Sequence, residues 1–191
     1  MLSNRFWVAG LIALAPVFSS ASAGRQMDVI AYFAKARSED RDGLARKTKI
    51  VDVRAAQPGE VVTTIIKGEG KETQSKPAKP GDQVVRNRCA ETGNEEYLVA
   101  ANKFASRYEG PIGSANNDGW QSYRPRGREM RFTLVRERDG SFSFQAPWGE
   151  QMVARPGDAI VQDPMNEKDT YRVQGAAFAC TYEIIKAPKQ S

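Results

Sequence analysis

Hydrophobic and polar residues alternate along much of the chain with the two-residue period of β-strands. Runs rich in β-branched residues occupy 49–54 and 61–66, and alternating runs occupy 130–136 and 141–144. Such runs are typical of strands because successive side chains point to opposite faces of a sheet. A Pro-Gly turn separates the first two runs, and an Asp-Gly turn separates the second two. Since these are favoured hairpin turns, we predict a β-hairpin in each place.

Further strands and two helical segments complete the predicted elements. Short apolar runs at 159–161 and 171–173 predict strands. Residues 27–46 have apolar side chains at helical spacing among Lys and Arg, with Gly43 as the expected stop. A Phe-x-x-x-Tyr segment at 178–182 places two rings on one face of a short helix, which we expect to cover an open end of the sheet. The predicted fold is therefore mainly β, of the α+β class.

The chain contains the same motif twice. A Pro-Gly-Asp turn is followed, after a loop, by Tyr-x-Val-x4-Phe-x3-Tyr-Glu at 97–109 and again at 171–183. The turn residues are Pro80, Gly81, Asp82, Pro156, Gly157 and Asp158. Because self-similarity at a fixed period indicates repeated structural units, we predict two homologous small β-rich subdomains, each closed by a short helix. The expected segments are a signal peptide at 1–23, an N-terminal helical segment at 24–46, repeat 1 at 47–109, a linker at 110–122, repeat 2 at 123–186 and a C-terminal tail at 187–191.

The repeated unit resembles a known small domain. A basic start, a strand, a hairpin, Pro-Gly-Asp, a strand and the Tyr-x-Val-x4-Phe-x3-Tyr-Glu segment are similar to the Pro-Gly-Asp-Tyr-Gly type of domain in short phage and bacterial proteins. The resemblance covers 46–109 and 123–183. This chain has Gln83 and Ala159 where an aromatic residue usually follows the aspartate. The resemblance implies a shared fold, and it implies no particular activity.

The first residues have the layout of a secretory signal. Arg5 precedes an apolar run at 6–18, and Ala21-Ser22-Ala23 precedes Gly24. The run is shorter than the roughly 20 residues that span a bilayer as a helix, so we expect cleavage after Ala23 rather than a retained anchor. No later apolar stretch is long enough to cross a membrane. The sequence therefore predicts an exported protein, periplasmic or secreted, without a transmembrane span in the mature chain.

Export changes the interpretation of the two cysteines, because thiols pair in oxidising compartments. Cys89 and Cys180 are a candidate disulfide that would join one repeat to the other. Such a bond would stabilise the fold by about 3–5 kcal/mol. The alternative is two unpaired thiols, with Cys180 buried as a small hydrophobic residue.

Catalytic chemistry has few candidates in this chain. The absence of histidine excludes the usual Ser-His-Asp and Cys-His sites, and no phosphate-binding glycine loop is present, so we expect no cofactor, metal or catalytic residue. Asp82 and Asp158 could form a carboxylate pair between the repeats, but turn chemistry favours a structural role for both. Recurring tyrosines at 97, 108, 171 and 182 have the spacing of core or sheet-edge residues, with ligand stacking as the alternative.

Basic and aromatic residues gather at 120–131. The arginines there, Arg124, Arg126, Arg128 and Arg131, are candidates for binding an anion, and the alternative is an ordinary solvated edge. The net charge of +5 is mild, and nucleic acid is not an expected partner for an exported protein. We predict a non-catalytic binding or structural module for an anionic envelope component or a protein, of undetermined oligomeric state. The alternatives are a carboxylate-based enzyme and a secreted effector that acts on another cell.

Overall fold

The computed structural model describes residues 25–189, so the predicted signal peptide lies outside the described residues. Over this range the fold is mainly β, as the sequence predicts, with two five-stranded antiparallel sheets, two two-stranded ribbons and three short helices. No helix of the described part is long and apolar enough to span a membrane.

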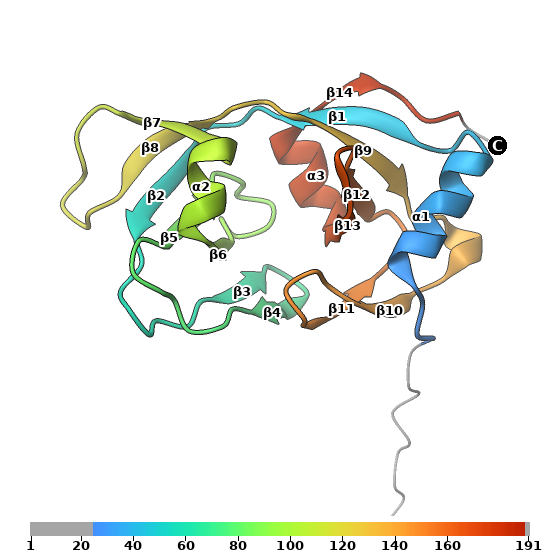
Figure 1. Ribbon diagram of the computed structural model, residues 1–191, viewed down its shortest axis with the longest axis horizontal. Helices are drawn as coiled ribbons and strands as arrows, with labels where there is room; N and C mark the ends of the chain where they lie inside the picture. The colour runs from blue at the N-terminus through green and yellow to red at the C-terminus, as the bar shows by residue number, and fades with distance from the viewer. Residues whose placement is uncertain (1–24, 190–191) are drawn as a thin grey trace, which may run out of the picture.

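The first sheet has the order β6-β5-β2-β8-β7. Its strands are β6 (Glu96–Val99), β5 (Gln83–Asn87), β2 (Val51–Ala55), β8 (Gln121–Pro125) and β7 (Tyr108–Ile112). Helix α2 (Ala101–Arg107) connects β6 to β7. The ribbon of β3 (Thr63–Ile66) and β4 (Gly70–Gln74) lies beyond this sheet, at the bottom of Figure 1.

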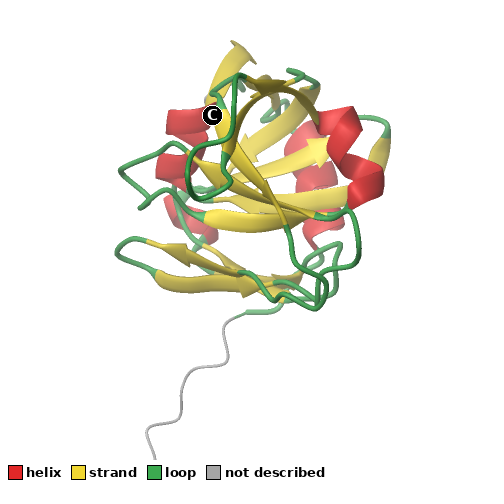
Figure 2. Ribbon diagram, turned by 90° about the vertical axis from the view of Figure 1, so that its left-hand side faces the viewer, coloured by secondary structure: helices red, strands yellow, loops and turns green. Residues whose placement is uncertain are grey.

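The second sheet has the order β13-β12-β9-β1-β14. Its strands are β13 (Asn166–Val173), β12 (Ala159–Asp163), β9 (Glu129–Leu134), β1 (Gly43–Lys47) and β14 (Tyr182–Lys186). Helix α3 (Gly175–Thr181) connects β13 to β14, and the ribbon of β10 (Phe142–Gln145) and β11 (Gln151–Ala154) lies below, so that both ribbons form one side of the molecule (Figures 1 and 2).

Each sheet contains one strand that is followed in the chain by a strand of the other sheet. Strand β1 comes directly before β2 in the chain, but it pairs with β9 and β14 of the second sheet. Strand β8 comes directly before β9, but it pairs with β2 and β7 of the first sheet. The two sheets are therefore joined by two crossing chain segments, which run along the top of Figure 1.

The two predicted hairpins are wrong. Strand β2 pairs with β5 and β8 rather than β3, and β9 pairs with β12 and β1 rather than β10. The Asp-Gly segment forms a single 3-10 turn at Glu137–Asp139, where the Asp139 carboxylate accepts hydrogen bonds from the backbone N–H and the guanidinium of Arg136. This turn sends the chain into a separate ribbon, because the central strands are buried most fully when they lie between partners from distant parts of the chain.

The helix predicted at 27–46 is shorter than expected. Helix α1 (Val29–Ser38) begins at Asp28, whose carboxylate accepts hydrogen bonds from the backbone of Ile30 and Ala31, an ordinary N-cap. The expected stop, Gly43, is instead the first residue of β1. A Cβ atom there would lie 2.4 Å from the carbonyl oxygen of Lys186, so this glycine is needed for close approach of two strands.

Candidate functional site

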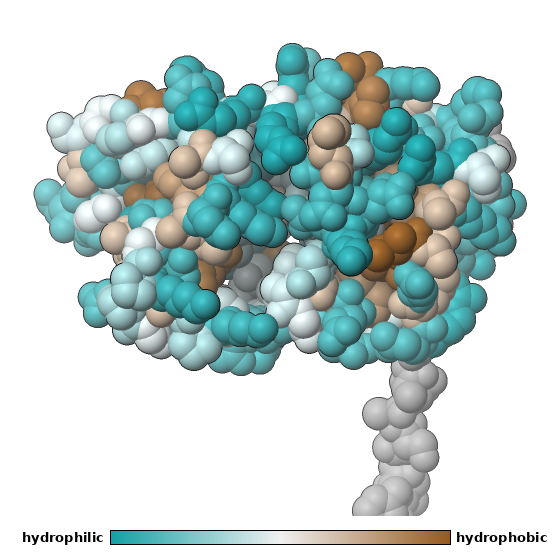
Figure 3. Space-filling view, viewed as in Figure 1, coloured by the Kyte–Doolittle hydropathy of each residue, from teal (hydrophilic) through white to brown (hydrophobic). Residues whose placement is uncertain are grey.

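A cavity of about 770 Å³ lies at the centre of the molecule, and we call it the central cavity. Residues of both five-stranded sheets and both ribbons line it. Apolar side chains such as Val62, Leu98, Met130 and Met152 form part of its wall, and the space-filling view shows the surface hollowed near the middle of this face (Figure 3). Charged and phenolic side chains also line it.

The repeated tyrosines meet at this cavity. Tyr108 and Tyr182 each begin the strand that follows a short helix, and each ring stacks on the phenylalanine four residues earlier, with centroids 5.3 and 4.9 Å apart. Tyr97 and Tyr171 also line the cavity, and the hydroxyls of Tyr97 and Tyr108 are 2.8 Å apart. The rings therefore pack in the cores at the expected intervals, while the same residues contribute to the cavity wall.

Burial keeps these phenols protonated. It raises the pKa of Tyr108 to about 12, and it raises the pKa values of Tyr97 and Tyr182 well above their ordinary value. Because a neutral phenol has an O–H group, each of these tyrosines can act as a hydrogen-bond donor at neutral pH.

Lys47 lies at the end of β1 and lines the same cavity. Its Nζ donates hydrogen bonds to Oδ1 of Asn87 at 2.6 Å and to the hydroxyl of Tyr97 at 2.7 Å. Burial lowers the pKa of Lys47 to about 8, while the nearby Glu95 carboxylate opposes the shift. The cavity therefore contains an amine that is only partly charged just above neutral pH.

Arginine and carboxylate groups around the cavity are paired with one another. Nη2 of Arg107 is 2.9 Å from Oδ2 of Asp169, and Nη2 of Arg128 is 3.1 Å from Oδ2 of Asp163. These pairs connect α2 to the second sheet and the start of β9 to β12. They neutralise each other's charge and leave the cavity without a strong excess of either sign from these residues.

Arg172 forms the most buried ion cluster. Its guanidinium is 2.7 Å from Glu72, 2.8 Å from Glu69 and 2.6 Å from Asp158. Three carboxylates thus share one cation, and burial raises the pKa of Glu72 to about 7. Glu72 and Lys47 both line the cavity with pKa values near neutrality.

The aspartates of the two Pro-Gly-Asp turns have matching contacts. Oδ2 of Asp82 accepts from the backbone N–H of Lys79, and its Oδ1 accepts from Ala101, the first residue of α2. Asp158 accepts in the same way from Arg155 and from Gly175, the first residue of α3. Each aspartate therefore ties its turn to the start of the next helix, and both of its oxygens already accept hydrogen bonds.

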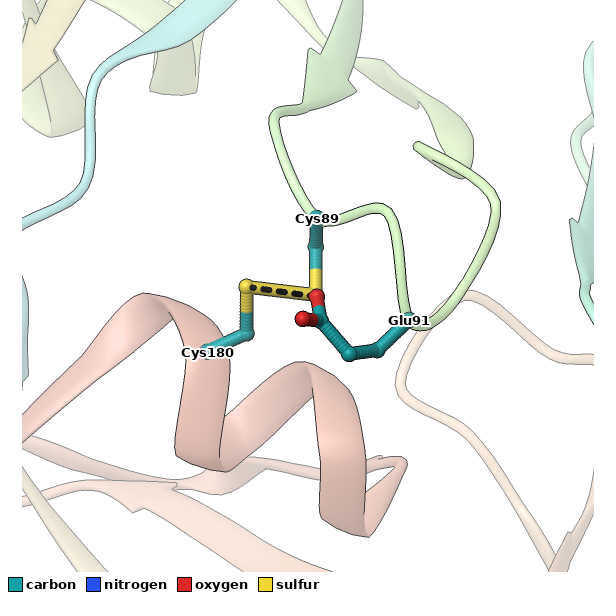
Figure 4. A group of neighbouring side chains, drawn as sticks. All are labelled: Cys89, Glu91 and Cys180. Atoms are coloured by element: carbon teal, nitrogen blue, oxygen red, sulfur yellow. Dashed lines mark hydrogen bonds between the residues drawn. A yellow bond between two sulfur atoms is a disulfide. The ribbon is translucent and has the colours of Figure 1, made fainter.

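The two cysteines form a disulfide. The Cα atoms of Cys89 and Cys180 are 6.1 Å apart, within the normal range, and the bond joins the loop after β5 to α3 (Figure 4). Oε2 of Glu91 is 3.2 Å from the Cys89 sulfur, and Nζ of Lys49 is 3.2 Å from the Cys180 sulfur. Since α3 contributes to the cavity wall, this bond fixes one wall of the cavity to the first sheet.

The four arginines of the predicted anion site are divided between elements. Arg124 lies in β8 of the first sheet and Arg131 in β9 of the second. Arg131 is 2.7 Å from Asp42, Arg128 pairs with Asp163, and Arg126 is 3.8 Å from Glu109. Three of the four guanidinium groups therefore have a carboxylate partner within the protein.

Sequence reasoning did not single out Lys47 or Glu72. A weak signal was present, because Gly43, Ala45 and Lys47 occupy one face of an alternating strand whose other two members are small and buried. A charged residue at such an inward position indicates a polar interior. Comparison with known protein families, characterised proteins and solved structures finds no match to this chain.

Proposed function

We propose that this protein is a binding module whose ligand, a small molecule with an apolar part and polar groups, occupies the central cavity. The observation that supports this most directly is the cavity itself. Its volume of about 770 Å³ falls within the range of roughly 300–1,000 Å³ that is usual for small-molecule sites. Its wall combines apolar residues with a few fixed polar groups, which is the usual composition of such sites.

The proposal retains the expectation of an exported protein, periplasmic or secreted. We also propose that the chain consists of two homologous subdomains that have exchanged their first strands, β1 and β8. In support, each sheet has a strand that follows a Pro-Gly-Asp turn in second place and a strand that follows a short helix at the edge. We further propose that each subdomain is related to the Pro-Gly-Asp-Tyr-Gly type of domain. The support for this relation is the residues of the two motifs.

An acid–base enzyme is the second candidate. Glu72, with a pKa of about 7, and Lys47, with a pKa of about 8, both line the central cavity. General acids and bases work best when their pKa values lie near the operating pH. Turnover of a cavity ligand that Glu72→Gln abolishes, with binding retained, would favour this function over simple binding.

Binding can be tested with the neutral fluorescent dye phenylnaphthylamine on the full chain. We expect saturable binding, with a fluorescence increase as the dye enters an apolar environment. Leu98 lines the cavity, so Leu98→Trp should fill part of it and weaken binding by roughly tenfold or more. Leu134 is 42% exposed on β9 and is the matched control, so Leu134→Trp should bind as the parent does.

Two results would contradict the proposed function. One is the absence of saturable dye binding to the folded parent chain. The other is equal binding by the Leu98→Trp and Leu134→Trp variants, because this would place the dye outside the cavity. Thermal unfolding of each variant shows whether it is folded under the conditions of the titration.

A further inference from the structure

We propose that the ligand of the central cavity is an anion, and that one of its carboxylate, sulfonate or phosphate oxygens binds between Lys47, Arg107 and the hydroxyl of Tyr108. This inference rests on the proposed binding function and specifies the chemistry of the ligand. The evidence for it is the set of charged and hydrogen-bonding groups that contact Lys47.

Lys47 lacks a direct counter-ion. Its ammonium group has three N–H donors, and two of them reach the neutral oxygens of Asn87 and Tyr97. Among residues 25–189, its Nζ forms no ion pair with a carboxylate within 4.0 Å, and Glu95 acts on it only at longer range. A cation that is removed from water without an ion pair is costly, so an anion at this position would be favourable.

The acidic groups near the cavity are already engaged by other partners. The carboxylate of Glu95 accepts hydrogen bonds from Nδ2 of Asn87 and from the hydroxyl of Thr92. Asp169 is paired with Arg107, and Asp163 with Arg128. Glu72 is held by Arg172. Of the three cations at least partly buried in this wall within residues 25–189, Arg107 and Arg172 have carboxylate partners, and Lys47 directly contacts only neutral groups.

The direction of the hydrogen bonds provides a second donor. The Tyr97 oxygen accepts from Lys47, and its hydroxyl proton has two acceptors in reach, the Tyr108 oxygen at 2.8 Å and Oδ1 of Asn87 at 3.4 Å. The shorter contact directs this proton toward Tyr108. This leaves the Tyr108 hydroxyl proton available to an acceptor in the cavity. Arg107 also lines the cavity, and its guanidinium has further N–H groups beyond the one bonded to Asp169.

An anion bound here would change the protonation of Lys47. The groups that face its amine are Glu95 before β6, Tyr97 on β6, Arg107 on α2, Tyr108 on β7 and Tyr182 on β14. The phenols stay neutral below pH 10, so Lys47 is the group that titrates near pH 8. Because the pKa of Lys47 is about 8, a bound anion that favours its charged form should make binding take up protons at pH 8.

The test compares two dyes of the same shape on the full chain. Anilinonaphthalene sulfonate is phenylnaphthylamine with one added sulfonate, so the pair isolates the effect of the negative charge. We expect the sulfonate to bind the parent roughly tenfold or more tightly than the neutral dye, because one close charge pair is worth at least that factor. Lys47→Met should abolish this preference, so that the ratio of the two dissociation constants falls to about one.

Two further variants guard against misfolding and general charge effects. Tyr108→Phe removes only one hydroxyl, and it should weaken binding of the sulfonate relative to the neutral dye by roughly three- to tenfold. Lys168→Met removes an exposed lysine of β13 that does not line the cavity, and it should change neither dye. Titration calorimetry of the parent in two buffers of different ionisation enthalpy, at pH 8, measures the proton uptake directly.

The outcomes separate the two proposals. If the parent binds neither dye, the proposed function fails. If it binds both dyes equally, or if Lys47→Met and Tyr108→Phe keep the preference for the sulfonate, the cavity binds small molecules but the anion site is wrong. Loss of the preference in Lys168→Met to the same extent as in Lys47→Met would assign the effect to general surface charge, which would also overturn the inference.

Discussion

Removal of the Cys89–Cys180 disulfide should lower the stability of this protein by several kcal/mol. The bond joins residues 91 positions apart, so it greatly restricts the unfolded chain. The chain-entropy relation gives a loss of about 15 cal/mol/K for a loop of this size, which corresponds to about 4–5 kcal/mol at 25 °C. Few native contacts are lost, because Cys180 lies half-exposed on α3 and a serine has nearly the same size as a cysteine.

The assay is urea unfolding of three samples: the parent, the parent treated with a phosphine reductant, and the Cys89→Ser/Cys180→Ser variant. With a slope of about 2 kcal/mol per molar urea, the midpoint should fall by about 2 M in the second and third samples. The reductant should have no effect on the double serine variant, which serves as its control. Ala179→Ser, on the exposed side of the same helix, should leave the midpoint unchanged.

Two results would refute this reasoning. If reduction lowers the free energy of unfolding of the parent by less than about 1 kcal/mol, the restricted loop does not contribute as the entropy relation requires. If thiol titration of the unreduced, denatured chain finds two free thiols, the bond is absent from the protein. A fall in the double serine variant that greatly exceeds the fall on reduction would instead indicate lost packing around the buried Cys89.

Arg172→Met should lower the free energy of unfolding by about 3–5 kcal/mol, because Asp158 and Glu72, which are largely buried, would lose their cation. The exposed Arg155→Met should cost under about 1 kcal/mol, and equal losses in urea unfolding would contradict this. The pKa of Lys47 is lower in the folded chain, so the unfolded chain binds more protons between about pH 8 and 10. The free energy of unfolding should therefore rise with pH over this range. Urea unfolding of Lys47→Met should lack this rise, and an identical rise in the variant would disprove the burial effect. Asp82→Asn and Asp158→Asn should each lower stability by about 1–3 kcal/mol through lost charged hydrogen bonds to helix starts, and a loss below about 0.5 kcal/mol in thermal unfolding would argue against that role.

Much of the local structure followed from the sequence. Alternating residues marked the strand at 130–136, because a two-residue period places side chains on one face of a sheet, and a short apolar run marked the strand at 159–161. The Pro-Gly-Asp turns were recognisable because glycine must adopt a positive φ there, and both Gly81 and Gly157 have φ of 89°. The end of the helix predicted at 27–46 could not be placed from the sequence. A glycine that ends a helix cannot be distinguished there from a glycine that lets two strands approach closely.

Strand pairing was decided by the tertiary structure. Backbone hydrogen bonds are the same for every residue, so the sequence of β1 did not indicate that it would pair with β9 and β14 rather than with its neighbour β2. The favourable Asp-Gly turn was outweighed by burial of Phe132 and Val161 between distant strands. Local turn preference is worth less than the apolar area that long-range pairing buries.

The sequence by itself determined the β-rich class, the repeated turns and the positions of the tyrosines, because these depend on residue spacing over a few positions. Only the tertiary structure decided that the tyrosines of both copies meet Lys47 at one cavity, and that Cys89 lies within bonding distance of Cys180. The pKa of Lys47 likewise depends on burial by elements far from it in the chain. Desolvation and distance are properties of the folded arrangement, and no local pattern of residues specifies them.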